Sequence, residues 1–238
     1  MLVAQEPTVV TELIAHVNWA IHEADQLQSR ITPEVLAAEG MSSPRVRHLL
    51  NNLCSRPHTR YLEVGVWRGA TFCAALCGNG GTIESAVAVD DFSEFRGCAD
   101  AFRQTCELCL PDGNPAWILQ AQDFRRVPHK AVDTPNVYFY DGDHQRQSQC
   151  DAIMHFWAAL SDPCIFVVDD WQWKHVLAGT MDGLGAINAV VHKSWTLKSP
   201  LVEDVDAWWN GVFVAVLGKP RAPEPAGIEK AAGTTLPG

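Results

Sequence analysis

The 238-residue sequence has no apolar run long enough to span a bilayer, which argues against a transmembrane helix. It also lacks the basic and then apolar segments of a secretion signal, since residues 1–17 are amphipathic and carry Glu6 and Glu12. We therefore expect a cytoplasmic protein that has no membrane partner and keeps its thiols reduced.

Basic residues are scarce: 18 Lys and Arg stand against 28 Asp and Glu, giving a net charge of −10. Binding to a phosphate backbone needs clustered Lys and Arg, so this balance argues against nucleic acid as a partner. Most of the acidic residues are expected on a solvated surface, although a metal ion or a cationic ligand is compatible with them.

The eight cysteines lack the pattern of a zinc site. Cys106 and Cys109 form a CxxC motif and Cys73 and Cys77 lie four residues apart, but neither pair is matched by a second pair at zinc-ligand spacing. We interpret these thiols as small, buried apolar side chains.

The most informative stretch is YLEVGVWRGATFCAAL, residues 61–76. Its first four residues predict a strand, Gly65 and Gly69 a tight turn, and the small residues from Ala70 a helix. Glycines allow close approach to a ligand, and the free N–H groups at the start of a helix attract negative charge. The stretch therefore predicts a nucleotide-type site at the first crossover of an α/β sheet, the alternative being that the glycines serve turn geometry alone.

Strand and helix patterns alternate four times along the chain, which predicts one sizeable α/β domain. Helices are expected over 8–28, from Ser43 onward, over 98–110, over 147–160 and from near Asp182 through Val191. Strands are expected over 61–64, 86–91, 116–122, 136–140 and 164–168, with residues 194–199 and 210–218 pairing as an antiparallel hairpin at the sheet edge.

Three of the predicted strands end in pairs of aspartates, namely Asp90 and Asp91, Asp141 and Asp143, and Asp169 and Asp170. The carboxyl ends of parallel strands lie on one rim of a sheet, so these carboxylates should converge, and their crowding requires a cation or hydrogen-bond donors. The last two pairs offer the oxygen ligands that Mg²⁺ or Ca²⁺ prefers, while the alternative is that the aspartates cap the following helices. Asp90 follows the glycine turn at the spacing of a ribose-binding acid.

Four segments, YLEVGVWRGATF, VDDFSEF, YFYDGDH and FVVDDWQW, together resemble the class I S-adenosylmethionine-dependent methyltransferases. The similarity runs from about Met41 to Gly218, and the nearest branch is the small-molecule O-methyltransferases, including the metal-dependent macrocin and catechol types. It implies a Rossmann-like α/β fold whose seven-stranded, mostly parallel sheet has an antiparallel last strand and helices on both faces. The expected division is an N-terminal helical extension (1–55), the cofactor-binding domain (56–218) and a flexible C-terminal tail (219–238).

The resemblance also assigns the cofactor contacts. Glu63, Gly65 and Gly69 match the loop that holds the methionine part of S-adenosylmethionine, and Asp90 matches the ribose-binding acid. Asp123 and Phe124 occupy the place of adenine contacts. The remaining expected contacts are Val66, Trp67, Thr71, Asp91 and Asp141.

The metal-dependent branch implies that Asp141, Asp169 and Asp170 hold a divalent ion, here Mg²⁺ or a similar cation. The ion would bind an acceptor hydroxyl, lower its pKa and orient its oxygen. Asp143 or His144 would be the general base beside Asp141, while His144 has an equal alternative in capping a helix or orienting a metal ligand.

The acceptor pocket is the part that departs most from the family pattern. Gln145 and Arg146 stand where the family often has an aromatic residue, and Asp162, Pro163 and Cys164 where it often has Pro-Gly-Gly. Tryptophans could line an aromatic pocket or pack in the core or an interface; they are Trp171, Trp173, Trp208 and Trp209.

The predicted function is methyl transfer to a hydroxyl of a small-molecule metabolite. The N-terminal helices and exposed tryptophans are compatible with a homodimer or with a cap over the active site. The rival hypotheses are a non-catalytic, cofactor-binding scaffold protein and a nicotinamide-dependent oxidoreductase. The oxidoreductase is disfavoured because the ExGxxxG spacing differs from GxGxxG and no Tyr-xxx-Lys pair occurs.

Overall fold

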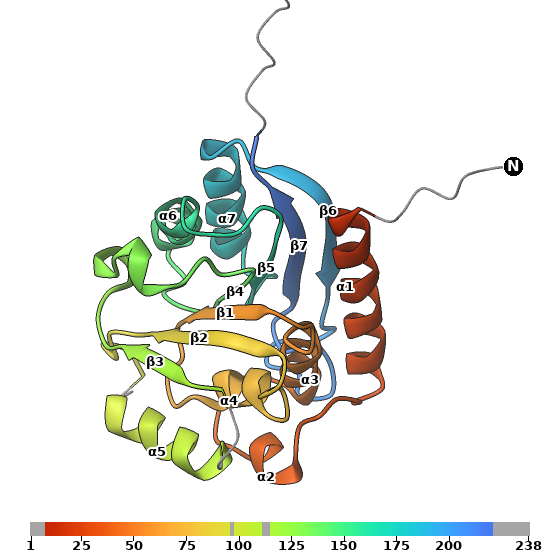
Figure 1. Cartoon of the computed structure of the whole chain (residues 1–238), viewed down its shortest axis with the longest axis vertical. Coiled ribbons are helices and arrows are strands. Elements are labelled where there is room, and N and C mark those ends of the chain that lie inside the picture. The colour runs from red at the N-terminus through yellow and green to blue at the C-terminus, as the bar shows by residue number, and fades with distance from the viewer. Residues whose placement is uncertain (1–7, 96–97, 111–114, 221–238) are drawn as a thin grey trace, which may run out of the picture.

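A computed structural model describes residues 8–95, 98–110 and 115–220 and shows a seven-stranded sheet of order β3-β2-β1-β4-β5-β7-β6 (Figure 1). Strands β1 to β5 pair in parallel, whereas β7 runs antiparallel to both β5 and β6. The strands are β1 (Thr59–Val64), β2 (Ile83–Val89), β3 (Trp117–Gln120), β4 (Val137–Tyr140), β5 (Cys164–Val168), β6 (Val190–Leu197) and β7 (Val212–Gly218). The predicted mostly parallel sheet with an antiparallel last strand and an edge hairpin is confirmed.

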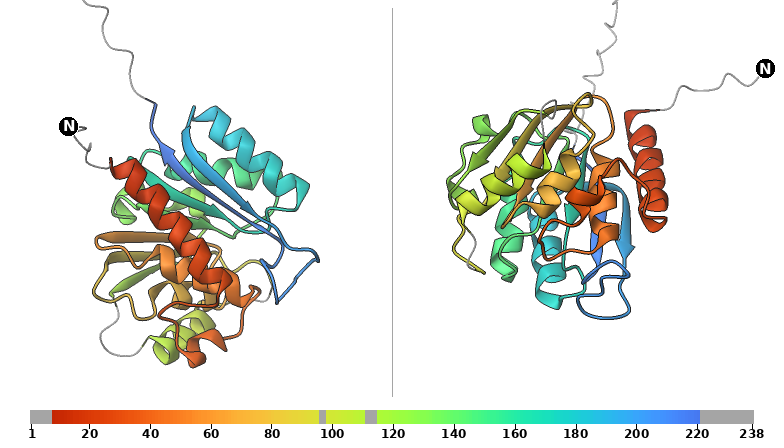
Figure 2. Two further views of the ribbon diagram at one scale, coloured as in Figure 1. Left: turned by 90° about the vertical axis from the view of Figure 1, so that its right-hand side faces the viewer. Right: turned by 90° about the horizontal axis from the view of Figure 1, so that it is seen from below.

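Helices cover both faces of this sheet (Figures 1 and 2). One face carries α1 (Val9–Asp25), α2 (Pro33–Leu36), α3 (Pro44–Leu53), α4 (Ala70–Leu76) and α5 (Ala99–Cys109); the other carries α6 (Arg146–Phe156) and α7 (Lys174–Ala186). Two short 3-10 helices, η1 (Phe124–Arg126) and η2 (His129–Ala131), lie between β3 and β4. Because both faces are covered, the central strands are apolar on both sides.

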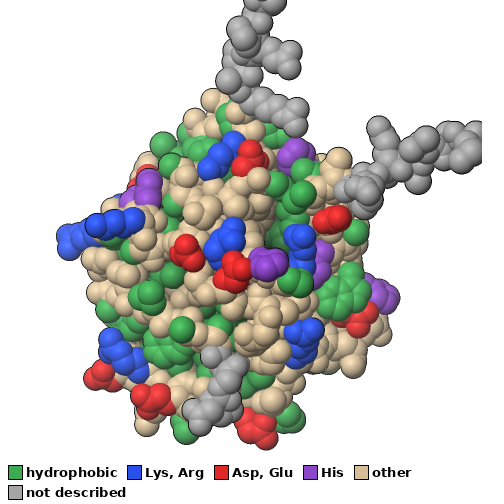
Figure 3. Space-filling view, viewed as in Figure 1, with side chains coloured by type: hydrophobic (Ala, Val, Ile, Leu, Met, Phe, Trp, Pro, Cys, Tyr) green, Lys and Arg blue, Asp and Glu red, His purple; other side chains and the backbone are tan. Residues whose placement is uncertain are grey.

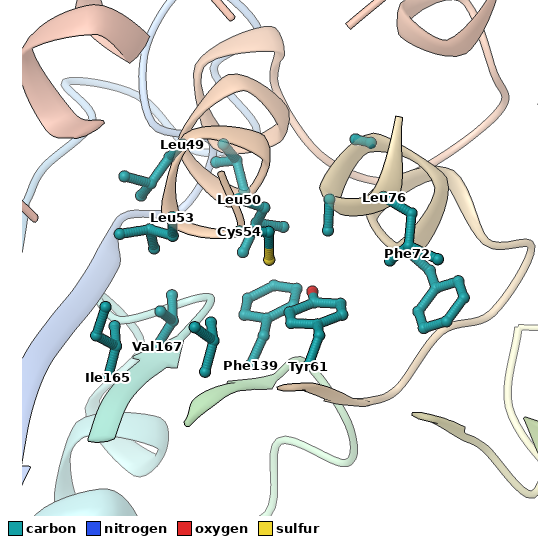
Figure 4. Close-up of a cluster of buried hydrophobic side chains, with 14 of the residues drawn as sticks. Leu49, Leu50, Leu53, Cys54, Tyr61, Phe72, Leu76, Phe139, Ile165 and Val167 are labelled. Carbon is teal, nitrogen blue, oxygen red and sulfur yellow. The ribbon is translucent and has the colours of Figure 1, made fainter. Parts of the chain in front are cut away.

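Helix α3 begins as its sequence predicts. The Ser43 hydroxyl accepts a hydrogen bond from the backbone N–H of Val46, and Pro44 occupies the first helical position, where its missing N–H costs nothing. The leucines of this helix point toward Tyr61 of β1 and Phe139 of β4 (Figure 4). This packing fixes the first helical layer against the centre of the sheet.

Helix α7 differs from its prediction: it spans Lys174–Ala186 rather than starting near Asp182, and Val191 belongs to β6. Glycines have low helix propensity, and those in α7 interrupt the helical pattern of apolar residues, so the first half of the helix was not predicted. A Cβ at Gly179 would lie 2.1 Å from the carbonyl oxygen of Arg146, and one at Gly183 would lie 2.5 Å from Ile153. The glycines therefore allow α6 and α7 to pack closely. Short helix α2 was also not predicted.

The N-terminal helices belong to the same packed body as the sheet. Leu13 and Val17 of α1 are buried in the core, where α1 packs against α3. Asn18 accepts hydrogen bonds from Trp195 (3.0 Å) and Lys193 (3.3 Å) of β6. Of the predicted flexible tail, residues 221–238 lie outside the described residues. Among the residues described, no helix is long and apolar enough to cross a membrane.

Candidate functional site

A cavity of about 290 Å³ opens at the carboxyl ends of the parallel strands. Its walls come from the exits of β1, β2, β3, β4 and β5 and from the loop between β6 and β7. This is the edge where a doubly wound sheet binds its ligand. The predicted convergence of the aspartates is confirmed for Asp90, Asp91, Asp141, Asp143 and Asp170, all of which line the cavity.

The two glycines of the first turn allow neighbouring segments of the chain to pack closely against each other. Gly65 has a φ of 89°, and a Cβ there would lie 2.0 Å from the carbonyl oxygen of Asp141. Gly69, also at 89°, begins α4, and its Cβ would lie 3.0 Å from the ring of Phe102. Of the two, Gly65 lines the cavity and Gly69 does not. Besides the predicted approach of a ligand, Gly65 lets β1 lie against β4, and Gly69 lets α4 lie against α5.

Three further residues expected to contact the cofactor, Glu63, Val66 and Thr71, also lie outside the cavity lining. Glu63 is fully buried, and its carboxyl group accepts hydrogen bonds from the hydroxyls of Tyr61 (2.6 Å) and Thr71 (2.5 Å). Burial raises the pKa of Glu63 to about 8, so the group holds its proton at neutral pH. Glu63 thus ties β1 to the start of α4 behind the site.

Asp90 is held in place by the glycine turn itself. Its carboxylate accepts hydrogen bonds from the backbone N–H of Trp67 and of Phe92, both at 2.7 Å. Burial raises the pKa of Asp90, while these backbone donors act in the opposite direction. Asp91 accepts from the Ser93 hydroxyl at 2.6 Å and is more exposed. Each Asp90 oxygen keeps a lone pair that can accept a ligand hydroxyl.

Asp123 and Phe124, the expected adenine contacts, line the cavity next to β3. Asp123 caps η1 by accepting from the backbone N–H of Arg125 at 2.8 Å. The Arg125 guanidinium lies 4.4 Å from the centre of the Phe124 ring and forms an ion pair with Asp151 at 2.9 Å. An aromatic edge and a fixed cation therefore form this end of the cavity.

A group of two carboxylates and one imidazole lies at the exits of β4 and β5. The Nε2 atom of His144 is 2.6 Å from Oδ2 of Asp170 and 3.9 Å from Oδ1 of Asp141. Burial raises the pKa of Asp141 to about 7, to which the charge of Asp170 adds. Burial lowers the pKa of His144, but its electrostatic interactions with the carboxylates of Asp141 and Asp170 outweigh this effect and raise the pKa to about 10. His144 is therefore an imidazolium that compensates the neighbouring carboxylates.

Of the predicted metal ligands, Asp141 and Asp170 lie together with His144, their ligand atoms all within 4.8 Å of one another. Asp169 is not one of these three residues, but burial and the neighbouring charges of Asp141 and Asp170 raise its pKa. Asp169 is buried and absent from the cavity lining, because successive side chains leaving a strand point to opposite faces. Its Oδ1 accepts from the backbone N–H of Asp170, whose φ is 52°, and its Oδ2 has no hydrogen-bond partner among the described residues. Carboxylate oxygens and a neutral imidazole suit a divalent ion, so the donor set fits once His144 has lost its proton.

Asp143, an expected general base, has both carboxylate oxygens engaged. They accept from the Ser148 hydroxyl at 2.5 Å and from the backbone N–H of Gln145 at 3.0 Å. These bonds shape the entry into α6, although Asp143 still lines the cavity. Lys174 is exposed at the start of α7, outside the lining.

The tryptophans divide between core and cavity. Trp173 and Trp209 line the cavity, whereas Trp171 stacks on Phe213 at 4.2 Å and Trp208 is buried in the core. The Trp173 ring lies 4.8 Å from that of His144. Two of the four candidate tryptophans therefore line the cavity.

Several lining residues escaped the sequence reading, among them Met41, Phe95, Glu203 and Asn210. They come from loops without a periodic pattern. Asn210 donates to Oδ1 of Asp170 at 2.6 Å and accepts from the backbone N–H of Glu203 at 2.8 Å. A polar residue beside the tryptophans was the only available signal.

No protein-family model matches the sequence, and no curated protein is similar to it. Solved structures do share its architecture. Cofactor-bound Rv0187 from MTB has a TM-score of 0.54 at 15% identity, covering 92% of this chain and 94% of that one. TrmN from Thermus thermophilus has a TM-score of 0.56 at 18% identity, with 81% and 53% covered. The O-methyltransferase TomG from Streptomyces achromogenes, in complex with SAM, has a TM-score of 0.50 at 15% identity, with 92% of each chain covered.

These similarities, together with the strand order and the cavity position, define the fold class. The chain has the Rossmann-like fold of the class I S-adenosylmethionine-dependent methyltransferases. At identities of 15 to 18%, the similarity concerns the fold.

Proposed function

We propose that this protein is an S-adenosylmethionine-dependent methyltransferase that methylates a hydroxyl group of a small molecule with the help of a divalent ion. The observation that carries the proposal is the arrangement of the cavity. Asp90, Asp123 and Phe124 form one end at the exits of β2 and β3, and the group of Asp141, His144 and Asp170 lies at the exits of β4 and β5.

The first end offers what a nucleoside ligand requires. Asp90 is fixed by two backbone donors, so it is oriented before a ligand arrives and its remaining lone pairs can accept ribose hydroxyls. The Phe124 ring supplies an apolar surface for a base. When bound, S-adenosylmethionine supplies an activated methyl group, so the protein has to position the acceptor and exclude water.

The second end offers proton and metal chemistry. Asp141, His144 and Asp170 are the residues that would hold a divalent ion, which lowers the pKa of an acceptor hydroxyl. In the absence of an ion, His144 paired with Asp170 lies at the cavity wall, where its imidazole can exchange a proton with an acceptor hydroxyl. Trp173 and Trp209 add flat walls that suit an aromatic acceptor.

Charge supports a small acceptor rather than nucleic acid. The cavity lining includes eight carboxylate residues against Arg125 and His144, and the cation of Arg125 is already paired with Asp151. On the face shown in Figure 3, basic side chains are interspersed with acidic ones instead of forming a patch. The described surface therefore does not offer the clustered cations that binding of a phosphate backbone requires.

Isothermal titration of S-adenosylhomocysteine, with magnesium and with a chelator, tests the cofactor end. We expect micromolar affinity, which corresponds to about −8 kcal/mol. Absence of binding in both conditions would overturn the proposal. Methyl transfer from labelled S-adenosylmethionine to a panel of phenols and sugars then tests the reaction.

The rival functions give different results in the same experiments. Cofactor binding without transfer to any acceptor would favour a non-catalytic binding protein. Oxidation of a reduced nicotinamide, with no binding of S-adenosylhomocysteine, would favour an oxidoreductase.

A further inference from the structure

Two large apolar side chains, Met41 and Phe95, lie at the entrance of the cavity. Both belong to its lining, yet they are 41% and 59% exposed. A side chain that lines a cavity and is also open to solvent lies at its mouth. Met41 comes from the loop between α2 and α3, and Phe95 from the loop that follows β2 and carries Asp90. A ligand held by Asp90 therefore has these two rim residues beside it.

Trp67 of the glycine turn holds the rim residue Phe95. Its indole Nε1–H donates to the backbone carbonyl of Phe95 at 3.1 Å, and its backbone N–H donates to Asp90 at 2.7 Å. Trp67 itself lines the cavity. One residue of the turn thus fixes the loop after β2 at two points, the carboxylate at its start and the rim residue further along.

The next residue, Arg68, holds the loop that carries the other rim residue. Its guanidinium forms an ion pair with Glu39, two residues before Met41. The same guanidinium lies 4.9 Å from the centre of the Trp67 ring. Neighbouring side chains of a single turn therefore connect both sides of the cavity mouth.

The loop between α2 and α3 also has a fixed shape of its own. Arg47 of α3 is 4% exposed and donates four hydrogen bonds to residues 36–42. A Cβ at Gly40 would lie 2.4 Å from the Cβ of Ala70, so the loop rests directly on the start of α4. Because Arg47 maintains its shape, loss of the contact with Arg68 would change the position of Met41 without unfolding the loop.

We propose that Trp67 and Arg68 are positioning residues of the cofactor site, which hold Phe95 and Met41 at its mouth and thereby slow the release of the bound nucleoside ligand. This inference rests on the proposed function, since it takes S-adenosylmethionine and its product S-adenosylhomocysteine as that ligand. A rim that is tethered on two sides has to loosen before the ligand leaves, so the tethers act on the dissociation rate more than on the association rate.

The first test is the dissociation rate of S-adenosylhomocysteine from the full-length protein, measured by surface plasmon resonance. Trp67→Phe keeps an aromatic ring and removes the indole N–H. We expect release about two- to tenfold faster, as for the loss of one hydrogen bond. Trp195→Phe is the matched control, because its indole donates to Asn18 at 3.0 Å outside the cavity lining. That variant should release the ligand at the unmutated rate.

The second test is a double-mutant cycle of Arg68→Gln and Glu39→Gln. Each single variant should speed release about two- to fivefold, as expected for a partly exposed ion pair, and the double variant should be no faster than either one. Arg68→Lys retains the charge and should restore most of the slow release. Arg103→Gln is the control, since it breaks an exposed ion pair with Asp100 outside the cavity lining.

The outcomes separate this inference from the function on which it rests. If the unmutated protein does not bind S-adenosylhomocysteine, the proposed function fails, and this inference fails with it. If the ligand binds but Trp67→Phe and Glu39→Gln release it at the unmutated rate, only the positioning role is overturned. Equal acceleration by the two control variants would also overturn it. Glu39 is exposed, so its variant tests the tether without a risk to folding.

Discussion

His144 and Asp170 lie 2.6 Å apart between Nε2 and Oδ2, and this ion pair joins the exit of β4 to the exit of β5. The other oxygen of Asp170 accepts from the Asn210 side chain, also at 2.6 Å. One carboxylate thus connects a turn, a strand end and the loop between β6 and β7. This arrangement explains how Glu203 and Trp209 of that loop come to line the same cavity as His144, which lies far from them in the sequence.

The first prediction concerns the divalent ion. Asp141→Asn should weaken the binding of Mg²⁺ or Mn²⁺ at least tenfold, because it removes a charged ligand from the group with His144 and Asp170. A calorimetric titration of the protein with the metal alone measures this change in affinity without relying on activity.

Asp169→Asn is the control for that titration. Asp169 was expected from the sequence to be a ligand but lies outside the group and the cavity. We expect its variant to bind the metal like the unmutated protein. Equal losses in both variants would restore the ligand set that the sequence suggested.

The second prediction concerns the nucleoside end of the cavity. Asp90→Asn should weaken the binding of S-adenosylhomocysteine by a factor of ten or more, as expected for a hydrogen bond to a charged group worth about 1.5–3 kcal/mol. The backbone N–H groups of Trp67 and Phe92 bind different oxygens of Asp90, so the single amide oxygen can accept from only one of them, and part of the loss would come from the turn. Asp91→Asn, whose side chain binds Ser93, should change the affinity less than threefold. Calorimetric titration compares the two, and equal effects would contradict the assignment of Asp90.

The extent to which the site could be predicted follows from the physics of strand ends. Asp90, Asp141 and Asp170 were predicted to converge because each follows a parallel strand. The sequence did not place His144 beside Asp141 and Asp170, nor Asp169 outside the cavity lining next to a left-handed residue at Asp170. Neither the direction of each side chain at the end of β5 nor the left-handed conformation of Asp170 can be deduced from the sequence pattern.

The fold was predicted better than its contacts. Ser43 and Pro44 allowed the start of α3 to be predicted, because helix capping depends only on residues next to one another in the sequence. The start of α7 was missed because Gly179 and Gly183 have low helix propensity and gain their stability from packing against α6, which is a tertiary effect. Glu203 and Asn210 could not be predicted, since they reach the cavity only through a loop anchored at Asp170.

The third prediction concerns the glycine turn. Gly65→Ala should destabilise the protein by about 2 kcal/mol or more, because the added Cβ would lie 2.0 Å from the Asp141 carbonyl oxygen and the residue has positive φ. Gly81→Ala is the matched control, since nothing lies within 4 Å of its Cβ position. That variant should stay within about 0.5 kcal/mol of the unmutated protein. Urea denaturation measures both, and a tolerated Gly65→Ala would show that β1 and β4 can separate.

The fourth prediction concerns the buried carboxyl of Glu63, whose pKa is about 8 in the folded chain against an ordinary value of 4.5. Between these values the native state holds a proton that the unfolded state has released, so the free energy of unfolding should fall as pH rises from 4.5 to 8 and level off above. Glu63→Gln keeps an acceptor for Tyr61 and Thr71 without a charge, so it should flatten this fall and be more stable than the unmutated protein at pH 8.

The expected difference is on the order of a few kcal/mol, measured by urea denaturation from pH 4.5 to pH 9. Glu84→Gln is the control: the hydrogen bond from His58 lowers the pKa of this exposed carboxyl, which is the opposite shift, so its removal should leave the fall between pH 4.5 and 8 in place. If Glu63→Gln shows the same fall as the unmutated protein, the fall arises from other groups, and Glu63 is ionised inside the fold. The contact between β1 and α4 would then be an anionic hydrogen-bond network rather than a neutral one.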